Sequence, residues 1–248
     1  MSNAEDASRK PERGVVAPFF PPPARGLAQD WRIDVYDATH ERERWQRYMD
    51  AANRSYAARG LQAVGEEHVI DVDRYATWFA EAVMVDAGGQ ELSVGGIRIH
   101  MPAADKELLL FEELKGYADI DALRRLLQPL WEQGVCHGGG LWVDSTHGSI
   151  GIAADLARAC LPIIAATGSQ WCIAMTHQHI LEAWASLGWL AVSDIPAFAY
   201  PDERYMSQVI LGGTQSWPES AAVWAAQQHA GASLSGPGRR FAIECMRS

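Results

Sequence analysis

The chain has 248 residues, of which 48% are hydrophobic and 21% are charged. That balance suits a folded domain with a sizeable core and excludes an intrinsically disordered chain. With 21 basic and 31 acidic residues the formal net charge is -10, which disfavours nucleic acid as a main partner. No segment reaches the roughly 18 uncharged apolar residues that span a bilayer, and residues 1–13 lack the apolar centre of a secretory signal. We therefore expect a cytoplasmic protein without a membrane span.

Residues 1–29 are rich in proline, alanine and charge, and they are expected to form an arm outside the folded domain. The elements expected after the arm are, in chain order, a strand at 31–36, helices at 41–59 and 72–79, strands at 80–86 and 91–100, helical segments within 102–134, a strand at 141–144, a helix at 151–166, a strand at 170–175, a helix at 177–187 and strands at 190–193 and 204–211. Asp37 and Thr39 offer capping oxygens to the first helix. The glycines at 138–140 are expected to break the chain before the strand that follows them.

The alternation of strands and helices in the second half predicts a mixed α/β sheet. We expect one domain over residues 30–212, and a loosely packed C-terminal extension over 213–248, where glycine, serine and alanine are frequent. No internal repeat is present.

The cysteines are too widely scattered for a disulfide framework. His137 follows Cys136, and His177 and His179 form a second pair, but no three ligands occur at a zinc-binding spacing. Side chains two positions apart on a helix also point in different directions. Free buried thiols and no metal site are the expectation.

A turn of small residues follows the strand that ends at Asp144 and opens the next helix. It reads Gly148-Ser149-Ile150-Gly151-Ile152-Ala153. Small residues let the backbone approach a pyrophosphate, and the free amides at a helix N-terminus donate hydrogen bonds to it. A second motif follows the next expected strand and reads His177-x-x-Ile180-x-x-x-Trp184-x-x-Leu187-Gly188-Trp189.

The element order and these two motifs resemble the GNAT superfamily of N-acyltransferases. The resemblance implies a mixed, mostly antiparallel sheet flanked by helices, with a splayed gap between the fourth and fifth strands. It also implies transfer of an acyl group to the amine of a small molecule or amino acid by direct attack. The donor would be a coenzyme A thioester (acetyl-CoA or a longer acyl-CoA) or an acyl carrier protein, and the resemblance fixes no oligomeric state.

Within this resemblance the turn at 148–153 corresponds to the acyl-donor loop. Gly148 stands where the family usually has Arg or Gln, and His147 lies one residue before it. Trp184 occupies the position of a tyrosine often proposed to protonate the leaving thiolate, and an indole cannot serve as that acid. The backbone of Trp142, Val143 and Asp144 would pair with the pantetheine arm like an added strand.

Three side chains are candidates for the general base: Asp144, His147 and His177. The alternative is that Asp144 is an edge residue and His177 a helix-capping residue. On the acceptor side the candidates are Glu67, Arg98 and Arg204. Arg204 is suited to meet a carboxylate, and an ordinary surface turn explains it equally well.

The segment from 102 to 134 is long for a plain acetyltransferase. It resembles the branch that contains acyl-homoserine lactone synthases and N-acyl amino acid synthases, which use long acyl chains. Its apolar residues at 108–111 and 123–130 are compatible with the wall of an acyl tunnel or with an ordinary core. Acylation of a protein N-terminus or lysine, and a non-catalytic module that binds acyl-CoA or a partner, are the remaining alternatives.

Overall fold

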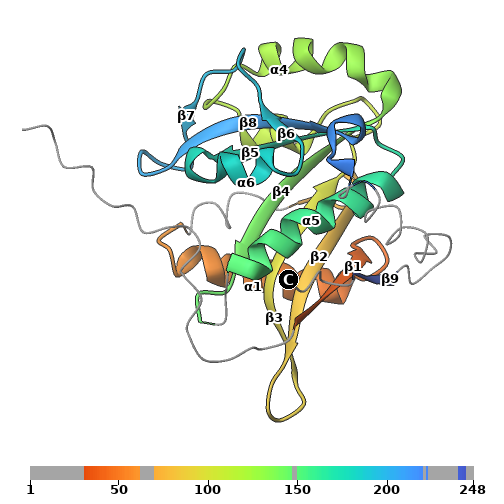
Figure 1. Ribbon diagram of the computed structural model, residues 1–248, viewed down its shortest axis with the longest axis vertical. Helices are drawn as coiled ribbons and strands as arrows, with labels where there is room; N and C mark the ends of the chain where they lie inside the picture. The colour runs from red at the N-terminus through yellow and green to blue at the C-terminus, as the bar shows by residue number, and fades with distance from the viewer. Residues whose placement is uncertain (1–30, 62–69, 147–149, 220–221, 223–239, 244–248) are drawn as a thin grey trace, which may run out of the picture.

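The computed structural model describes residues 31–61, 70–146, 150–219, 222 and 240–243. Its strands are β1 (Trp31–Asp37), β2 (Thr77–Val85), β3 (Glu91–His100), β4 (Val135–Val143), β5 (Trp171–His177), β6 (Trp189–Ala191), β7 (Phe198–Ala199), β8 (Met206–Gly213) and β9 (Arg240–Ile243). Its helices are α1 (Arg42–Ala57), α3 (Leu109–Glu113), α4 (Ile120–Leu127), α5 (Ile150–Ala166) and α6 (Leu181–Ala185), with short 3-10 helices η1 (Gln128–Gln133), η2 (Gln178–Ile180) and η3 (Thr214–Ser216). The strands form one nine-stranded sheet in the order β6-β8-β5-β4-β3-β2-β1-β9, with β7 also paired to β8 (Figure 1).

Strand β4 joins two parts of this sheet. It pairs antiparallel with β3 as far as Val143, and it pairs parallel with β5 only from Val135 to Gly138. All the other strand pairs are antiparallel. The expected mixed, mostly antiparallel sheet is therefore confirmed, and β4 and β5 diverge beyond Gly138.

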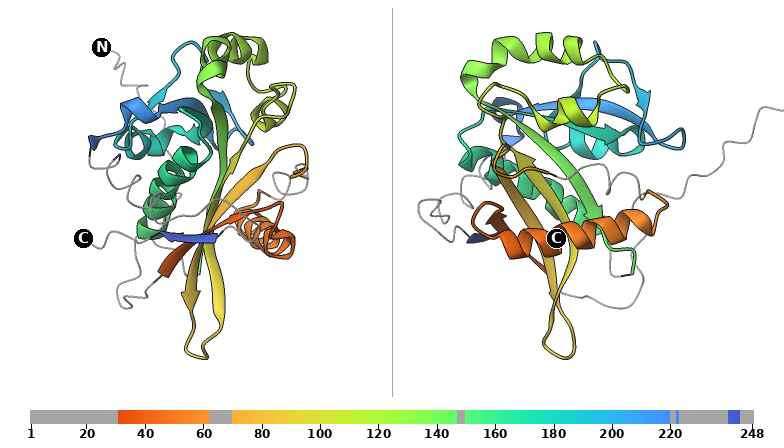
Figure 2. Two further views of the ribbon diagram at one scale, coloured as in Figure 1. Left: turned by 90° about the vertical axis from the view of Figure 1, so that its right-hand side faces the viewer. Right: turned by 180° about the vertical axis from the view of Figure 1, so that it is seen from behind.

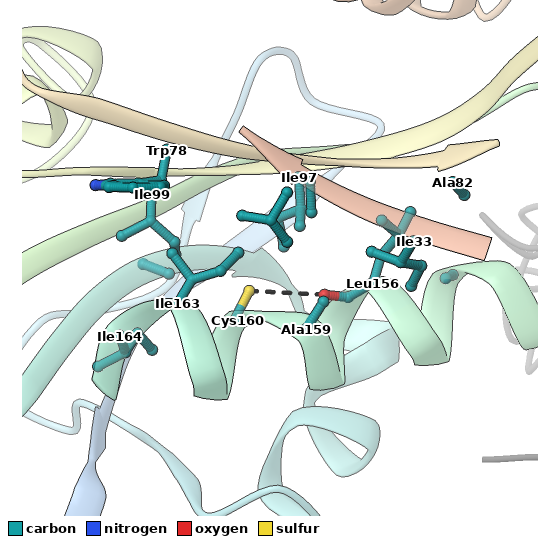
Figure 3. Packing of buried hydrophobic residues seen from close by; sticks show 14 of the residues in the cluster. Ile33, Trp78, Ala82, Ile97, Ile99, Leu156, Ala159, Cys160, Ile163 and Ile164 are labelled. Carbon is teal, nitrogen blue, oxygen red and sulfur yellow. Dashed lines mark hydrogen bonds between the residues drawn. The ribbon is translucent and has the colours of Figure 1, made fainter. Parts of the chain in front are cut away.

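Helices α5 and α1 cover opposite faces of the sheet (Figure 2). The buried side of α5 presents aliphatic residues and one thiol, including Leu156, Cys160 and Ile163, to Ile97 and Ile99 of β3 (Figure 3). These side chains are almost completely buried, and burying each aliphatic residue contributes on the order of 1.5–3 kcal/mol.

On the other face, α1 presents aromatic residues at helical spacing. Trp45 and Tyr48 stack at 5.3 Å, and both contact the ring of Phe79 on β2. Tyr48 lies over Gly96 of β3, where a Cβ atom would overlap the tyrosine ring. The close approach of α1 to the sheet therefore requires glycine at this position.

The segment between β3 and β4 forms a third part of the core. Its apolar residues pack against Val135, Ile173 and Val209 of the sheet, and the fully buried ones are Leu108, Leu110, Leu114, Leu123 and Leu127. Asp119 caps α4 by accepting a hydrogen bond from the backbone N–H of Ala122 at 3.0 Å. Of the two readings of these leucines, the structure favours core packing.

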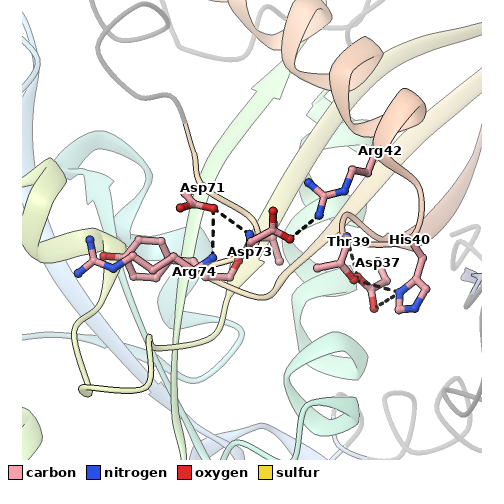
Figure 4. Close-up of polar contacts among 9 residues, drawn as sticks. Asp37, Thr39, His40, Arg42, Asp71, Asp73 and Arg74 are labelled. Carbon is pink, nitrogen blue, oxygen red and sulfur yellow. Dashed lines mark hydrogen bonds and ion pairs between the residues drawn. The ribbon is translucent and has the colours of Figure 1, made fainter.

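The helix expected at 72–79 is wrong. The Asp71 carboxylate accepts the backbone N–H groups of Asp73 at 3.0 Å and Arg74 at 3.2 Å, which makes a turn instead (Figure 4). Asp73 then pairs with Arg42 at the start of α1. Strand β2 begins soon afterwards, at Thr77. Aspartate side chains compete with helix formation in this way.

The prediction that Asp37 and Thr39 cap the first helix is also wrong. The N-cap of α1 is Glu41, which makes no side-chain capping bond. The Asp37 carboxylate instead accepts the N–H of Thr39 at 2.9 Å and holds the preceding turn (Figure 4).

The break expected at residues 138–140 is absent, because β4 runs through the glycines. His177 is the last residue of β5 rather than the first of a helix, and α6 starts only at Leu181. The sequence also left β7 and β9 unpredicted, and β9 pairs with β1 through Ile243 and Ile33. In the described ranges, no helix has the length and hydropathy needed to cross a membrane.

Candidate active site

A cleft opens where β4 and β5 diverge, and two cavities meet in it. The first, of about 120 Å³, lies on the face of the sheet that carries α1 and is lined by residues that include Arg98, Glu113, His137, His177 and Tyr200. The second, of about 330 Å³, lies between α5 and α6 and is lined largely by alanine and leucine. Leu141, Ile180 and Trp184 line both cavities, so the two lie next to each other.

A bulge in β4 shapes the wall of the cleft. Gly96 pairs with Trp142 and Arg98 with Gly139, so β4 has one more residue than β3 over this stretch. Gly140 lies in the bulge with φ +62°, and a Cβ there would be 2.7 Å from the guanidinium carbon of Arg98. Glycine is required at this position both by the backbone conformation and by the contact with Arg98.

Three titratable side chains form the floor of the first cavity. Arg98 Nη2 lies 3.4 Å from Glu113 Oε1, and His137 Nε2 lies 3.6 Å from Glu113 Oε2. The three residues are 7%, 9% and 1% exposed, respectively. They come from β3, α3 and β4, and so only the folded chain brings them together.

The guanidinium of Arg98 has few acceptors for its five N–H donors. Among the described residues, Nη2 pairs with Glu113, and Nη1 contacts the weakly accepting sulfur of Met49 at 3.9 Å. Nε has no hydrogen-bond partner among the described residues. A buried cation with an unfilled donor is costly unless a ligand completes its shell.

His137 carries no charge at neutral pH, because burial lowers the pKa of its imidazole to about 4. Behind it lies His100, with ring centroids 5.4 Å apart, and burial also lowers the pKa of His100 well below its usual value. The Thr77 hydroxyl donates to the carbonyl of Tyr75 and lies 2.8 Å from His100 Nδ1. Nδ1 of His100 is therefore the donor in that contact.

His177 lies on the wall of the first cavity, at the end of β5. Its Nδ1 is 3.0 Å from the hydroxyl of Ser207, which itself donates to the carbonyl of Tyr200. Nδ1 must therefore carry the proton, and Nε2 is the nitrogen that accepts. Burial, helped by the neighbouring His179, lowers the pKa of His177 to about 4, so the ring is neutral at pH 7.

Two phenols complete the first cavity, Tyr56 of α1 and Tyr200 after β7. Burial raises the pKa of both hydroxyls, which therefore stay protonated and can donate hydrogen bonds. The ring of Tyr117 packs edge-on against Tyr200 at 4.9 Å, on the outer side of the site.

The residues predicted to bind the donor lie in different parts of the structure. Ala153 lines the second cavity and Trp184 lines both, whereas Ile152 is buried in the core. Gly151 lies in the first turn of α5, of which Ile150 is the first residue. Glu67, His147, Gly148 and Ser149 lie outside the described residues.

Side chains from α1 and the residues just after it form hydrogen bonds with the end of β4. The carbonyl of Val143 accepts hydrogen bonds from Ser55 Oγ at 3.1 Å and from Arg59 Nη2 at 2.8 Å. The Trp142 ring packs edge-on against Tyr48 at 5.9 Å, away from the cleft. Residues 137–141 of β4 line the cleft. They lie directly before residues 142–144, which were predicted to pair with pantetheine.

Asp144 and Arg204 do not line either cavity. Asp144 accepts the backbone N–H of Thr146 at 2.8 Å just after β4. Arg204 is exposed, pairs with Asp202 at 2.6 Å and donates to the carbonyl of Gly60 at 3.3 Å. Of the two predicted acceptor-side residues that the structure describes, Arg98 lines the first cavity and Arg204 does not.

Sequence reasoning missed Glu113 and Tyr56, and considered His137 only as a metal ligand. A signal for Glu113 was present, because it interrupts an apolar run from Leu108 to Leu114. The same signal applies to Glu112, which is exposed and pairs with Arg74 at 2.9 Å.

No protein-family model matches the sequence. Uncharacterized proteins of Mycobacterium tuberculosis and Mycobacterium bovis are 32% identical to the chain over 170 residues, which is 67% of this chain. The match spans 62% of the length of each of these curated relatives, which is less than two thirds.

Two solved structures resemble the chain over most of its length. An acyl-CoA N-acyltransferase from Pseudomonas aeruginosa matches with a TM-score of 0.51 and 11% identity, over 74% of this chain and 100% of that one. An N-acyl amino acid synthase from uncultured soil microbes matches with a TM-score of 0.50 and 14% identity, over 80% of this chain and 99% of that one. At these identities the likeness concerns the fold, and the chain has the GNAT-like N-acyltransferase fold.

Proposed function

We propose that this GNAT-fold chain transfers an acyl group from a coenzyme A thioester to the amine of a small molecule. The observation that carries the proposal is the meeting of two cavities at Leu141, Ile180 and Trp184, where β4 and β5 diverge. Acyl transfer needs a donor and an acceptor that reach one point from separate sides, and this arrangement supplies both approaches.

The cavity between α5 and α6 suits the donor. Ala153, Ala157 and Ala183 keep it wide enough for an extended pantetheine arm, and its walls are mostly apolar. Ala153 belongs to the first turn of α5, so the cavity reaches the positive end of a long helix, where phosphate groups bind favourably. Acyl carrier proteins present the same pantetheine arm, so the alternative donor fits this cavity as well.

The cavity on the α1 face suits the amine. Tyr56, Leu61 and Tyr200 enclose it, and its volume of about 120 Å³ fits a small acceptor. In the reaction the amine nitrogen attacks the thioester carbon, the new C–N bond forms, the C–S bond breaks and the thiolate leaves. Positioning supplies most of the rate enhancement, and a general base typically adds about 10²–10⁴-fold.

Protonation of the thiolate needs no tyrosine at the position of Trp184. The hydroxyls of Tyr56 and Tyr200 stay protonated in the first cavity, and either can supply a proton to the thiolate formed where the two cavities meet. His177 is neutral at pH 7, with Nε2 as its accepting nitrogen, so it can bind the proton that the attacking amine releases.

Thermal unfolding with ligands tests the donor half. Coenzyme A, acetyl-CoA and medium- and long-chain acyl-CoAs are added to the full chain, and release of free thiol is followed with a panel of small amines. A ligand at 100 times its Kd stabilises the folded state by about 2.7 kcal/mol, which raises the Tm measurably. A rise in Tm that grows with acyl length would favour the long-chain N-acyl amino acid synthase alternative.

A matched pair of variants locates the binding site. Ala183→Trp fills the cavity between α5 and α6, and Ala185→Trp adds the same ring to another exposed position of α6 that lines neither cavity. We expect the first variant to lose the Tm shift and the second to keep it. A shift without thiol release from any amine would instead identify a non-catalytic acyl-CoA-binding module. No shift with any coenzyme A thioester would leave the proposal without support.

A further inference from the structure

Glu113 engages only part of the Arg98 guanidinium in the first cavity. The residue is 7% exposed, its Nε has no hydrogen-bond partner among the described residues, and Nη1 contacts the sulfur of Met49 at 3.9 Å. Gly140 backs the guanidinium so closely that a Cβ would be 2.8 Å from Nε and Nη1. Since the planar fork of arginine matches a carboxylate, a ligand carboxylate would satisfy donors that the protein leaves unfilled.

Glu113 places a carboxylate beside this cation, 3.4 Å from Nη2. His137 faces the second Glu113 oxygen at 3.6 Å, and it is neutral, so it adds no positive charge to the floor. The floor thus presents one positive and one negative group next to each other, in surroundings where unpaired charge is expensive.

We propose that the acceptor is an α-amino acid whose carboxylate binds to Arg98 and whose ammonium group faces Glu113. This inference rests on the proposed function, because the ammonium nitrogen is the atom that is acylated. In an α-amino acid the two charged groups are bonded to the same carbon, which matches the short separation of Arg98 and Glu113. A simple amine would leave the donors of Arg98 unfilled, and an acceptor with distant charges would satisfy only one of the two groups.

The proposed reaction begins with a proton transfer. Glu113 takes one proton from the bound ammonium, and the resulting amine attacks the thioester carbon. The C–N bond forms and the C–S bond breaks. The second nitrogen proton passes to His177, and one proton is returned to the leaving thiolate through Tyr56 or Tyr200. The products are the N-acyl amino acid, free coenzyme A and one proton that Glu113 returns to solvent.

The test compares three forms of each acceptor on the unmodified protein. They are the α-amino acids, their α-amides, and the amines that lack the carboxyl group, each with acetyl-CoA and one medium-chain acyl-CoA. We expect at least one α-amino acid to raise the Tm and to be acylated, with the amide and the amine about 10²–10⁴-fold poorer in kcat/KM, because they leave a buried charge unpaired.

Variants of Arg98 assign the effect to this residue. Arg98→Met should remove the discrimination between acid and amide, and Arg98→Lys, which keeps the charge in the core, should restore it in part. Binding of the acyl-CoA, measured by its Tm shift, should not change in either variant. This readout separates a lost acceptor site from a misfolded protein.

Equal use of the amide and the acid would overturn the inference and leave the proposed function intact. The absence of any Tm shift by an α-amino acid, or discrimination that persists in Arg98→Met, would also overturn it. Failure of the proposed function has a different signature, which is the loss of the Tm shift by coenzyme A thioesters.

Discussion

The two cavities that meet at Trp184 are lined by different kinds of side chain. Between α5 and α6 the walls are alanine and leucine, and the charged groups there, such as Arg158 and Glu182, lie at the surface. On the α1 face the charged groups of Arg98 and Glu113 are buried at the floor. The first kind of wall tolerates any extended apolar arm, whereas the second kind is favourable only with a ligand of matching charge.

This difference assigns specificity to one half of the site. Removing a methyl group from an apolar wall changes binding by about 1–3 kcal/mol, but an unmatched buried polar group discriminates by a far larger factor. The donor half is therefore expected to accept related thioesters, and the acceptor half to be selective. Each of the following changes alters one half and leaves the other as its internal control.

The largest effect is expected from Glu113→Gln. The change keeps the shape of the side chain and removes its charge, so the site loses its proton acceptor next to Arg98. We expect kcat to fall by about 10²–10³-fold, since a general base typically contributes 10²–10⁴-fold. The measurement is the rate of thiol release against pH, with acyl-CoA binding followed separately by the Tm shift.

Glu112→Gln is the matched control for this variant. Glu112 is the preceding residue of α3, but it is exposed and pairs with Arg74 and the hydroxyl of Tyr75. Its substitution should leave kcat within about twofold, because surface ion pairs contribute only about 0–1 kcal/mol. Equal rates for Glu113→Gln and the unmodified protein would show that another group, such as His177, takes the proton.

The acceptor half should also make the protein sensitive to acid. Burial lowers the pKa of His137 to about 4 in the folded state, whereas the unfolded chain titrates near 6.5. Above pH 6.5 both states are neutral; as the pH falls toward 4 only the unfolded state gains the proton, and stability falls. The expected loss from this group is on the order of 3 kcal/mol.

The measurement is the free energy of unfolding in urea at pH 7 and pH 4.5, for the unmodified protein and His137→Gln. The variant is expected to be less stable at pH 7 and to lose less stability on acidification. A pH dependence that is unchanged in the variant would mean that His137 is already charged in the folded protein.

Gly140→Ala is expected to disturb the acceptor half by a smaller amount. The new methyl group would lie 2.7 Å from the guanidinium carbon of Arg98, and alanine at φ +62° costs about 1–2 kcal/mol. We expect KM for the acceptor to rise about tenfold, as a 1.4 kcal/mol loss would produce, with acyl-CoA binding unchanged.

Gly89→Ala provides the same backbone cost without the contact. Gly89 lies in the hairpin between β2 and β3 with φ +82°, and a Cβ there meets no atom within 4 Å. It should lower stability by a similar amount and leave both substrates unaffected. If the two variants raise KM alike, the effect of Gly140→Ala reflects stability and not the position of Arg98.

The sequence predicted those parts of the fold that depend on local pattern. The strands expected at 80–86 and 91–100 correspond to the hairpin of β2 and β3, and the helix expected at 151–166 corresponds to α5. The prediction failed where a contact with a neighbouring residue or strand outweighs the local secondary-structure propensity. The glycines of β4 remain in a strand because β3 pairs with them on one side, and Asp71 turns the chain with its own side chain before a helix can form.

The site was predictable only where chain order determines it. The resemblance placed the cleft between the strand that ends at Asp144 and the strand after it, with Trp184 beside it, and Arg98 was named as an acceptor residue. Glu113 was not distinguishable from Glu112, because the sequence does not tell which side of a five-residue helix packs on the sheet. That choice is made by Leu110, Leu114 and the strands they contact, which are distant in the chain.

Arg204 gives the smallest expected effect, and it sharpens the boundary of the acceptor half. The motif order predicted it as a substrate-binding residue, but in the structure it is exposed, pairs with Asp202 and lines neither cavity. Arg204→Ala should leave stability almost unchanged, because exposed ion pairs contribute little, and should leave KM for the acceptor within about twofold. Steady-state kinetics beside an Arg98 variant would measure this. A KM raised as much as in Arg98→Met would mean that the acceptor reaches past Tyr200 to the surface, and that its carboxylate is bound at the mouth of the cavity instead of at the floor.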